Sequence, residues 1–234
     1  MKVLVIIPAF NEEENIRKVL NRMQNQYSQY DYLVINDCSR DNTEKILSEE
    51  NYNYVSLPVN LGIGGAVQTG YRYALKNNYD IAIQMDGDGQ HNPEYIKDII
   101  VPIANGEADS VIGSRFITKE GFQSSGLRRM GIKFLSGLIY LTCGIRVYDV
   151  TSGFRAVNKK CIRLFAEEYA QDYPEPEAIV ASAMQHIRIK EVPVIMNERE
   201  GGVSSISGLK SIYYMIKVSL AILISRLTGR RGRK

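Results

Sequence analysis

The 234-residue sequence contains no tryptophan, only two histidines and only three cysteines. The cysteines, Cys38, Cys143 and Cys161, lie far apart and show neither CxxC nor Cys/His ligand spacing. This pattern excludes a disulfide miniprotein and a structural zinc site, and it is typical of a reducing compartment. With 44% hydrophobic and 24% charged residues, the composition also excludes a disordered or collagen-like chain.

Long apolar runs are also absent. The longest uncharged apolar run near the end covers residues 218–225, whereas a membrane span needs about 20 residues. The apolar start at 3–10 is interrupted by Pro8 and followed by acidic residues, so it lacks the layout of a signal peptide. We therefore expect a cytoplasmic protein.

The net charge of +3 hides an asymmetry, because residues 200–234 carry seven Lys/Arg against one acid. Residues 209–227 are apolar on most sides, with Lys210 and Lys217 on one face. Such basic amphipathic helices lie in the interface of anionic membranes. We expect peripheral binding to the inner face of the cell membrane, with a packing helix or a homodimer contact as the alternative.

Short β-branched runs alternate with longer stretches of helical periodicity. Strands are expected at 3–7, 32–36, 54–57, 81–85, 110–113, 153–157 and 187–194, and helices at 13–26, 42–49, 63–76, 94–104, 127–143, 159–169 and 177–185. This alternation predicts an α/β fold whose mostly parallel sheet is covered by helices on both faces. Ligands bind beyond the carboxyl ends of the strands in such sheets. The chemistry is therefore expected in the loops at 8–12, 37–41, 61–65 and 86–90.

The loop at 86–90 carries two carboxylates directly after an apolar strand. Asp86, Asp88 and Gln90 offer hard oxygen ligands, which suit Mg²⁺ or Mn²⁺ shared with a substrate's phosphates. A tight Asp-Gly turn is the alternative. An EF-hand loop is excluded because His91 and Lys97 stand where Gly and Glu are needed. His91 is interpreted as a loop residue and not as a metal ligand.

A glycine-rich segment at 60–66 leads into a helix. Gly62 and Gly65 would let backbone N–H groups approach a nucleotide phosphate or ribose, although such turns are more often structural. Val67 and Tyr71 stand where the dinucleotide fingerprint and the P-loop require Gly and Lys. The segment therefore argues against a dinucleotide dehydrogenase and a P-loop ATPase.

Acids also follow the first two strands. Asp37 lies at the end of the second strand, where a carboxylate is well placed to bind a ribose or a base edge. For Asp41 and Ser39, in contrast, a helix N-cap is the preferred interpretation.

Six ordered motifs carry a family resemblance. They are Pro-Ala-Phe-Asn-Glu, Asn-Asp-Cys-Ser-x-Asp-x-Thr, Asn-Leu-Gly-x-Gly-Gly-Ala, Asp-Gly-Asp-Gly-Gln-His, Gly-Ser-Arg-Phe and Thr-Ser-Gly-Phe-Arg. The chain resembles the family-2 inverting glycosyltransferases, in the branch similar to dolichol-phosphate mannosyltransferase and bacterial polyprenyl-phosphate glycosyltransferases. The resemblance covers about residues 2–202. It implies a nucleotide-diphospho-sugar transferase (GT-A-like) fold at 1–202, followed by a basic extension at 203–234.

The resemblance also implies roles for particular residues. Nucleotide contacts fall on Pro8, Phe10, Glu12, Asp37, Asp86 and Arg199, the divalent metal on Asp86, Asp88 and Gln90, and a phosphate on Arg115. Phe10 stands where Tyr is usual, and Asn36 replaces the first acid of a common Asp-Asp pair, so the base and sugar are not assigned. The paired membrane spans that follow the domain in some relatives are missing. The chain has no tryptophan and so lacks the Gln-x-x-Arg-Trp element of processive synthases, and repeated chain extension is therefore not expected.

The acceptor is expected on a basic stretch. Residues 115–163 hold ten Lys/Arg against two acids, and Arg128, Arg129 and Arg155 flank an apolar helix. Arginine beside apolar surface suits a polyprenyl phosphate, although a solvated basic face is the usual alternative. A phosphate with a second pKa of about 6 needs no strong base. A hydroxyl of a lipid-linked glycan needs one, and Glu175 and Glu177 are then the candidates, which otherwise begin a helix.

Two other classes of protein are weighed against this interpretation. A nucleotidyltransferase needs a basic glycine-rich loop after the first strand, whereas 8–12 is acidic. A non-catalytic membrane-binding module has no use for Asp86, Asp88 and Gln90. The expected function is therefore sugar transfer from a UDP- or GDP-sugar, with no nucleic-acid partner.

Overall fold

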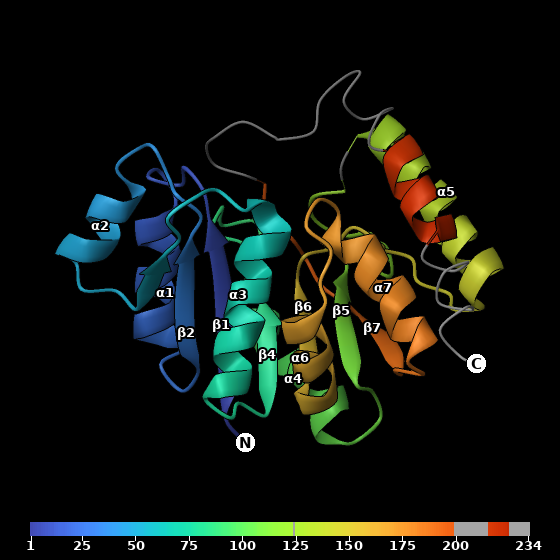
Figure 1. The fold of residues 1–234 in the computed structure, drawn as a ribbon, viewed down its shortest axis with the longest axis horizontal. Helices are drawn as coiled ribbons and strands as arrows, with labels where there is room; N and C mark the ends of the chain where they lie inside the picture. The colour runs from blue at the N-terminus through green and yellow to red at the C-terminus, as the bar shows by residue number, and fades with distance from the viewer. Residues whose placement is uncertain (124, 199–214, 225–234) are drawn as a thin grey trace.

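The computed structural model describes residues 1–123, 125–198 and 215–224. Its centre is a seven-stranded sheet in the order β3-β2-β1-β4-β6-β5-β7 (Figure 1). The strands are β1 (Val3–Ala9), β2 (Asp31–Asn36), β3 (Tyr54–Ser56), β4 (Ile81–Gln84), β5 (Ser110–Ser114), β6 (Arg155–Asn158) and β7 (Ile189–Pro193). The sheet is mostly parallel, which confirms the predicted fold class.

Helices cover both faces of this sheet. They are α1 (Ile16–Gln26), α2 (Thr43–Glu49), α3 (Gly62–Lys76), the 3-10 turn η1 (Pro93–Tyr95), α4 (Ile96–Ala104), α5 (Gly126–Cys143), α6 (Lys159–Glu167) and α7 (Pro174–Met184). All seven residues of β1 are buried, and alternate side chains enter two different cores. Val5 packs with α1, α2 and α4, whereas Ile6 packs with α3 and α6. Successive side chains of a strand point to opposite faces of the sheet, and both faces are covered here, so every position of β1 is apolar.

Strand β6 runs against its neighbours. It pairs antiparallel with both β4 and β5, and Arg155 lies opposite Gln84 at the carboxyl end of β4. The chain therefore enters β6 at the edge of the sheet where β1, β2 and β4 end. The segment that precedes β6 is brought to the edge at which ligands bind in such folds.

A third core joins α5 to the helical residues 215–224. Ile132 and Leu135 of α5 pack in one cluster with Val218 and Ile222, and Ile179 of α7 completes it. Figure 1 shows the two helices side by side, beyond α7. The expected helix at 209–227 is thus seen only at 215–224, and the rest of it lies outside the described residues. No helix in the described part of the chain is long and apolar enough to cross a membrane.

Candidate active site

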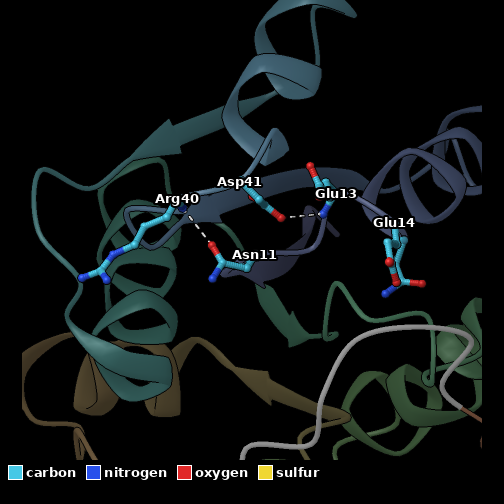
Figure 2. Close-up of a pocket in the computed structure, with 6 residues that line it drawn as sticks. Asn11, Glu13, Glu14, Arg40 and Asp41 are labelled. Carbon is cyan, nitrogen blue, oxygen red and sulfur yellow. Dashed lines mark hydrogen bonds between the residues drawn. The ribbon is translucent and has the colours of Figure 1, made fainter.

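The loops after β1 and β2 are joined side by side. Asn11 N donates to Ser39 Oγ over 3.0 Å and Arg40 N donates to Asn11 Oδ1 over 2.8 Å, while Glu13 N donates to Asp41 Oδ2 (Figure 2). Asp41 Oδ1 also accepts from Thr43 N at 2.9 Å, at the start of α2. The backbone at 10–13 is therefore fixed against the start of α2.

A cavity of about 310 Å³ lies between these loops. Its lining comprises Asn11, Glu13, Glu14, Asn15, Arg40 and Asp41. Figure 2 shows Arg40 directed away from the three carboxylates. None of the residues predicted to bind nucleotide or metal lines this cavity, so it is separate from the predicted site.

Asp37 is buried at the end of β2. Its Oδ1 accepts from Leu61 N at 2.7 Å, and its carbonyl accepts from Asn60 Nδ2 at 3.0 Å. Burial raises the pKa of the Asp37 carboxyl, and the backbone N–H groups of residues 61 and 62 oppose this rise. Asp37 therefore holds the loop that enters α3, and its contact with a nucleotide stays a prediction.

The glycines at the start of α3 allow a close approach of this helix to neighbouring backbone. Gly62 adopts φ +75°, and Gly64 N donates to Gln171 O over 3.1 Å. A Cβ on Gly64 would lie 2.0 Å from Ala170 O, and one on Gly65 would lie 2.4 Å from Leu61 Cβ. Glycine thus lets α3 lie against the backbone at 170–171. The nucleotide role of Gly62 and Gly65 is untested by this geometry.

The Asp86–Gln90 turn follows β4 directly. Gln84 Nε2 donates to Asp86 Oδ1 at 3.4 Å, and Asp88 Oδ1 accepts from Gln90 N at 3.0 Å. Gly89 adopts φ +77°, so a tight turn is present as well as the paired carboxylates. Asp86 N donates to His91 Nδ1 at 2.9 Å, which places His91 against the turn as a buried loop residue.

The carboxylates fit a hard cation that is shared with a substrate. Within the described residues no group of three or more His, Cys, Asp or Glu side chains converges as a metal site. Two carboxylates would therefore need phosphate oxygens or water to complete the coordination of Mg²⁺ or Mn²⁺, which is how these ions are commonly held. Burial raises the pKa of the Glu175 carboxyl, and the negative charge of Asp86 adds to this rise against the opposing charge of Arg155.

Arg115 is held by a buried carboxylate. Its Nε and Nη2 donate to the two oxygens of Asp149, each over 2.7 Å, and Nη2 also donates to Thr151 Oγ1. Asp149 is fully buried and was missed from sequence, although it is one of only two acids in the basic stretch 115–163. The predicted contact of Arg115 with a phosphate stays a prediction.

Arg155 lies inside the protein and not on the basic face. Its guanidinium donates to the carbonyls of Ser152, Val150 and Glu175 over 2.7, 3.2 and 2.8 Å. Arg128 and Arg129, in contrast, are exposed at the start of α5. The Arg155 donors join the segment before β6 to the start of α7. Its predicted contact with the acceptor stays a prediction.

The remaining predicted residues come from several parts of the chain. Pro8 is buried near the end of β1, Phe10 is 43% exposed, and Glu12 is buried in the loop before α1. Glu177 is half-buried, and burial, together with the charge of Asp172, raises its carboxyl pKa. Arg199 lies outside the described residues.

Comparison with known proteins assigns the family. Residues 4–165 match the family described as Glycosyl transferase family 2. The chain belongs to glycosyl transferase family 2. It is therefore a glycosyltransferase, as the six motifs predicted.

Two relatives match most of this glycosyltransferase. The UDP-N-acetylglucosamine–dolichyl-phosphate N-acetylglucosaminyltransferase of Methanococcus voltae is 33% identical over 82% of this chain and 84% of its own length. The undecaprenyl-phosphate mannosyltransferase of Micrococcus luteus is 30% identical over 100% of this chain and 99% of its own.

The fold is also shared with a solved structure. Glucosyl-3-phosphoglycerate synthase from Mycobacterium tuberculosis, in complex with Mn²⁺, UDP-glucose and phosphoglyceric acid, superposes with a TM-score of 0.72 at 20% identity. The match covers 96% of this chain and 79% of the synthase. At this identity the likeness shows the GT-A-like fold alone.

The buried position of Arg155 leads to a stability prediction. We expect Arg155→Lys to lower the free energy of unfolding by about 3 kcal/mol, because an ammonium cannot replace the planar fork on three carbonyls. Urea denaturation measures the change, with Arg128→Lys on the exposed start of α5 as the control, which should shift it by less than about 0.5 kcal/mol. An Arg155→Lys variant of wild-type stability that fails only in acceptor transfer would contradict this structural role and support the predicted acceptor contact.

Proposed function

We propose that this glycosyltransferase moves a sugar from a UDP- or GDP-linked donor to a polyprenyl phosphate, with inversion at the anomeric carbon and with Mg²⁺ or Mn²⁺. The observation that carries the proposal is the Asp86–Gln90 turn after β4, at the edge of the sheet where β2 also ends and Asp37 holds the start of α3. The acceptor class is supported by the names of the relatives, which act on dolichyl phosphate and undecaprenyl phosphate.

Asp86, Asp88 and Gln90 are the residues that would hold the cation against the donor diphosphate. A bound divalent cation supplies electrostatic stabilisation of the charge that grows on the leaving nucleoside diphosphate. Arg115 and Arg199 would add positive charge to the same phosphates. The Asp149 carboxylate fixes the Arg115 guanidinium from one side, which limits the directions in which its remaining N–H groups point.

The acceptor phosphate is proposed to bind at the start of α5. Arg128 and Arg129 are exposed there, and α5 contains no acidic residue. A polyprenyl phosphate is largely dianionic at neutral pH, since its second pKa is about 6, so it attacks without a strong base. A hydroxyl acceptor would instead depend on Glu175 or Glu177. Glu175 is turned toward Gln84, Arg155 and Asp86, whereas Glu177 is influenced by Asp172 and Lys217.

The metal assignment is tested with Asp88→Asn. This isosteric change removes one negative charge from the proposed ligands, so transfer should fall by about 100-fold or more and Mn²⁺-dependent donor binding should be lost. Calorimetry with UDP-sugars and GDP-sugars, with and without Mn²⁺, also identifies the nucleotide base of the donor. Asp98→Asn, at an exposed position of α4, is the matched control. Full activity of Asp88→Asn, or of the wild type in EDTA, contradicts the assignment.

The acceptor assignment is tested with Arg128→Ala and Arg129→Ala. Loss of one phosphate contact should lower transfer to undecaprenyl phosphate by about tenfold, while hydrolysis of the donor changes little, because these side chains lie on the acceptor side. Lys45→Ala on α2 is the control. If Glu175→Gln or Glu177→Gln removes nearly all transfer and the arginine variants do not, a sugar hydroxyl is the acceptor.

The membrane face is proposed to be formed by two helices. Exposed large apolar side chains line α5 and the neighbouring helix, namely Leu127, Met130, Phe134 and Leu141 on the first and Ile216, Leu220, Leu223 and Ile224 on the second. Arg128, Arg129 and Lys133 adjoin this apolar surface. Apolar area with bordering positive charge is the combination that binds the interface of anionic bilayers.

Vesicle sedimentation tests this surface. We expect the protein to bind vesicles rich in anionic lipid at low salt and to release in high salt or carbonate, because each basic residue contributes about 1 kcal/mol at an anionic surface. Leu141→Asp and Leu220→Asp should each weaken vesicle binding, whereas Val101→Asp, at an exposed position of α4, should not. Vesicle binding that is equal in all variants, or absent in the wild type, contradicts the proposal and favours a packing or dimer contact.

A further inference from the structure

His91 contacts Asp86 at both its backbone and its carboxylate. Asp86 N donates to His91 Nδ1 at 2.9 Å, and His91 Nε2 lies 3.8 Å from Asp86 Oδ2. An imidazole that accepts at Nδ1 carries its proton on Nε2. The Nε2 N–H therefore faces the carboxylate, and the acceptor nitrogen is occupied by the turn itself. His91 is thus placed to hold Asp86 and not to bind a cation directly.

The imidazole ring is fixed from its flat side by Phe154. The two rings stack with centroids 5.2 Å apart and an angle of 20° between their planes. Phe154 is 1% exposed and His91 is 7% exposed, so neither ring can turn into solvent. Because Phe154 directly precedes the antiparallel strand β6, the orientation of His91 depends on a segment more than 60 residues away in the sequence.

The residue before Phe154 closes the other side of Asp86. A Cβ on Gly153 would lie 3.1 and 3.2 Å from the two carboxylate oxygens of Asp86 and 2.9 Å from Gln84 Nε2. Only glycine therefore fits without moving the carboxylate or the amide. Gly153 and Phe154 together contact the Asp86 carboxylate and the ring that holds its backbone.

We propose that His91, seated on Phe154, is a positioning residue that sets the direction of the Asp86 carboxylate. The proposal rests on the metal-dependent function proposed above, and it adds a residue that acts through Asp86 without touching substrate or cation. Outer partners of metal ligands commonly change metal affinity by about 10- to 100-fold when they are replaced. The same range is expected here for loss of the His91 acceptor.

Two substitutions at His91 separate its acceptor from its ring. His91→Phe keeps a ring to stack on Phe154 but cannot accept from Asp86 N. His91→Asn places an amide oxygen near the position of Nδ1 but loses the ring. Calorimetry with UDP and with GDP, each in Mn²⁺, should show binding weakened about 10- to 100-fold in His91→Phe and restored to within about threefold of the wild type in His91→Asn. His186→Asn, at the other histidine, is the control and should bind as the wild type does.

A second readout does not involve the cation. Amide hydrogen exchange of the peptide 85–91 is measured in metal-free protein, with the peptide of β1 as a check on the fold. The Asp86 amide should exchange faster in His91→Phe and at the wild-type rate in His91→Asn. An unchanged exchange rate of the Asp86 amide in His91→Phe, or an equally increased rate in both variants, would overturn the proposal. If wild-type nucleotide binding does not depend on Mn²⁺, the proposed function fails, while the exchange rates still decide the role of His91.

Discussion

The antiparallel pairing of β6 with β4 and β5 places Arg155 opposite Gln84, two residues before Asp86. A parallel strand in this position would begin at the far edge of the sheet and would deliver its preceding loop there. Instead, the segment 149–154 arrives at the carboxyl ends of β1, β2 and β4. Gly153, Phe154 and the carboxylate of Asp149 reach the candidate active site for this reason, and each lies against a residue far away in the sequence.

Two buried arginines hold the segment 149–154 in place. A buried guanidinium is stable only when its donors are satisfied. Arg155 meets this demand with backbone carbonyls on the segment before β6 and at the start of α7, and Arg115 meets it with Asp149. The two arginines therefore stabilise the backbone around the candidate site from within. Arg128 and Arg129 at the start of α5, in contrast, are exposed to solution.

The helical layer beyond α7 has two different faces. Inward side chains of α5 and residues 215–224 share a core with Ile112 of β5 and Ile179 of α7. Outward side chains on the same two helices are large and apolar, such as Phe134 at 58% exposed and Leu220 at 53%. A helix that is apolar on both faces usually has a second apolar partner. The outer face of α5 therefore carries large apolar side chains beside the exposed Arg128, Arg129 and Lys133.

The sequence by itself determined the strand-helix alternation, the mostly parallel sheet and the position of the Asp86–Gln90 turn after a strand, because each follows from local periodicity and short spacing. Helix ends shifted by a few residues, as with α1, which begins at Ile16 and not at 13. Only the tertiary structure decided the direction of β6, the burial of Arg155, the packing of Gly64 on the backbone at 170–171 and the seating of His91 on Phe154. Each of these joins segments far apart in the chain. Local propensity carries no information about such contacts, because they depend on which strands become neighbours and on which backbone groups are left to be satisfied inside the protein.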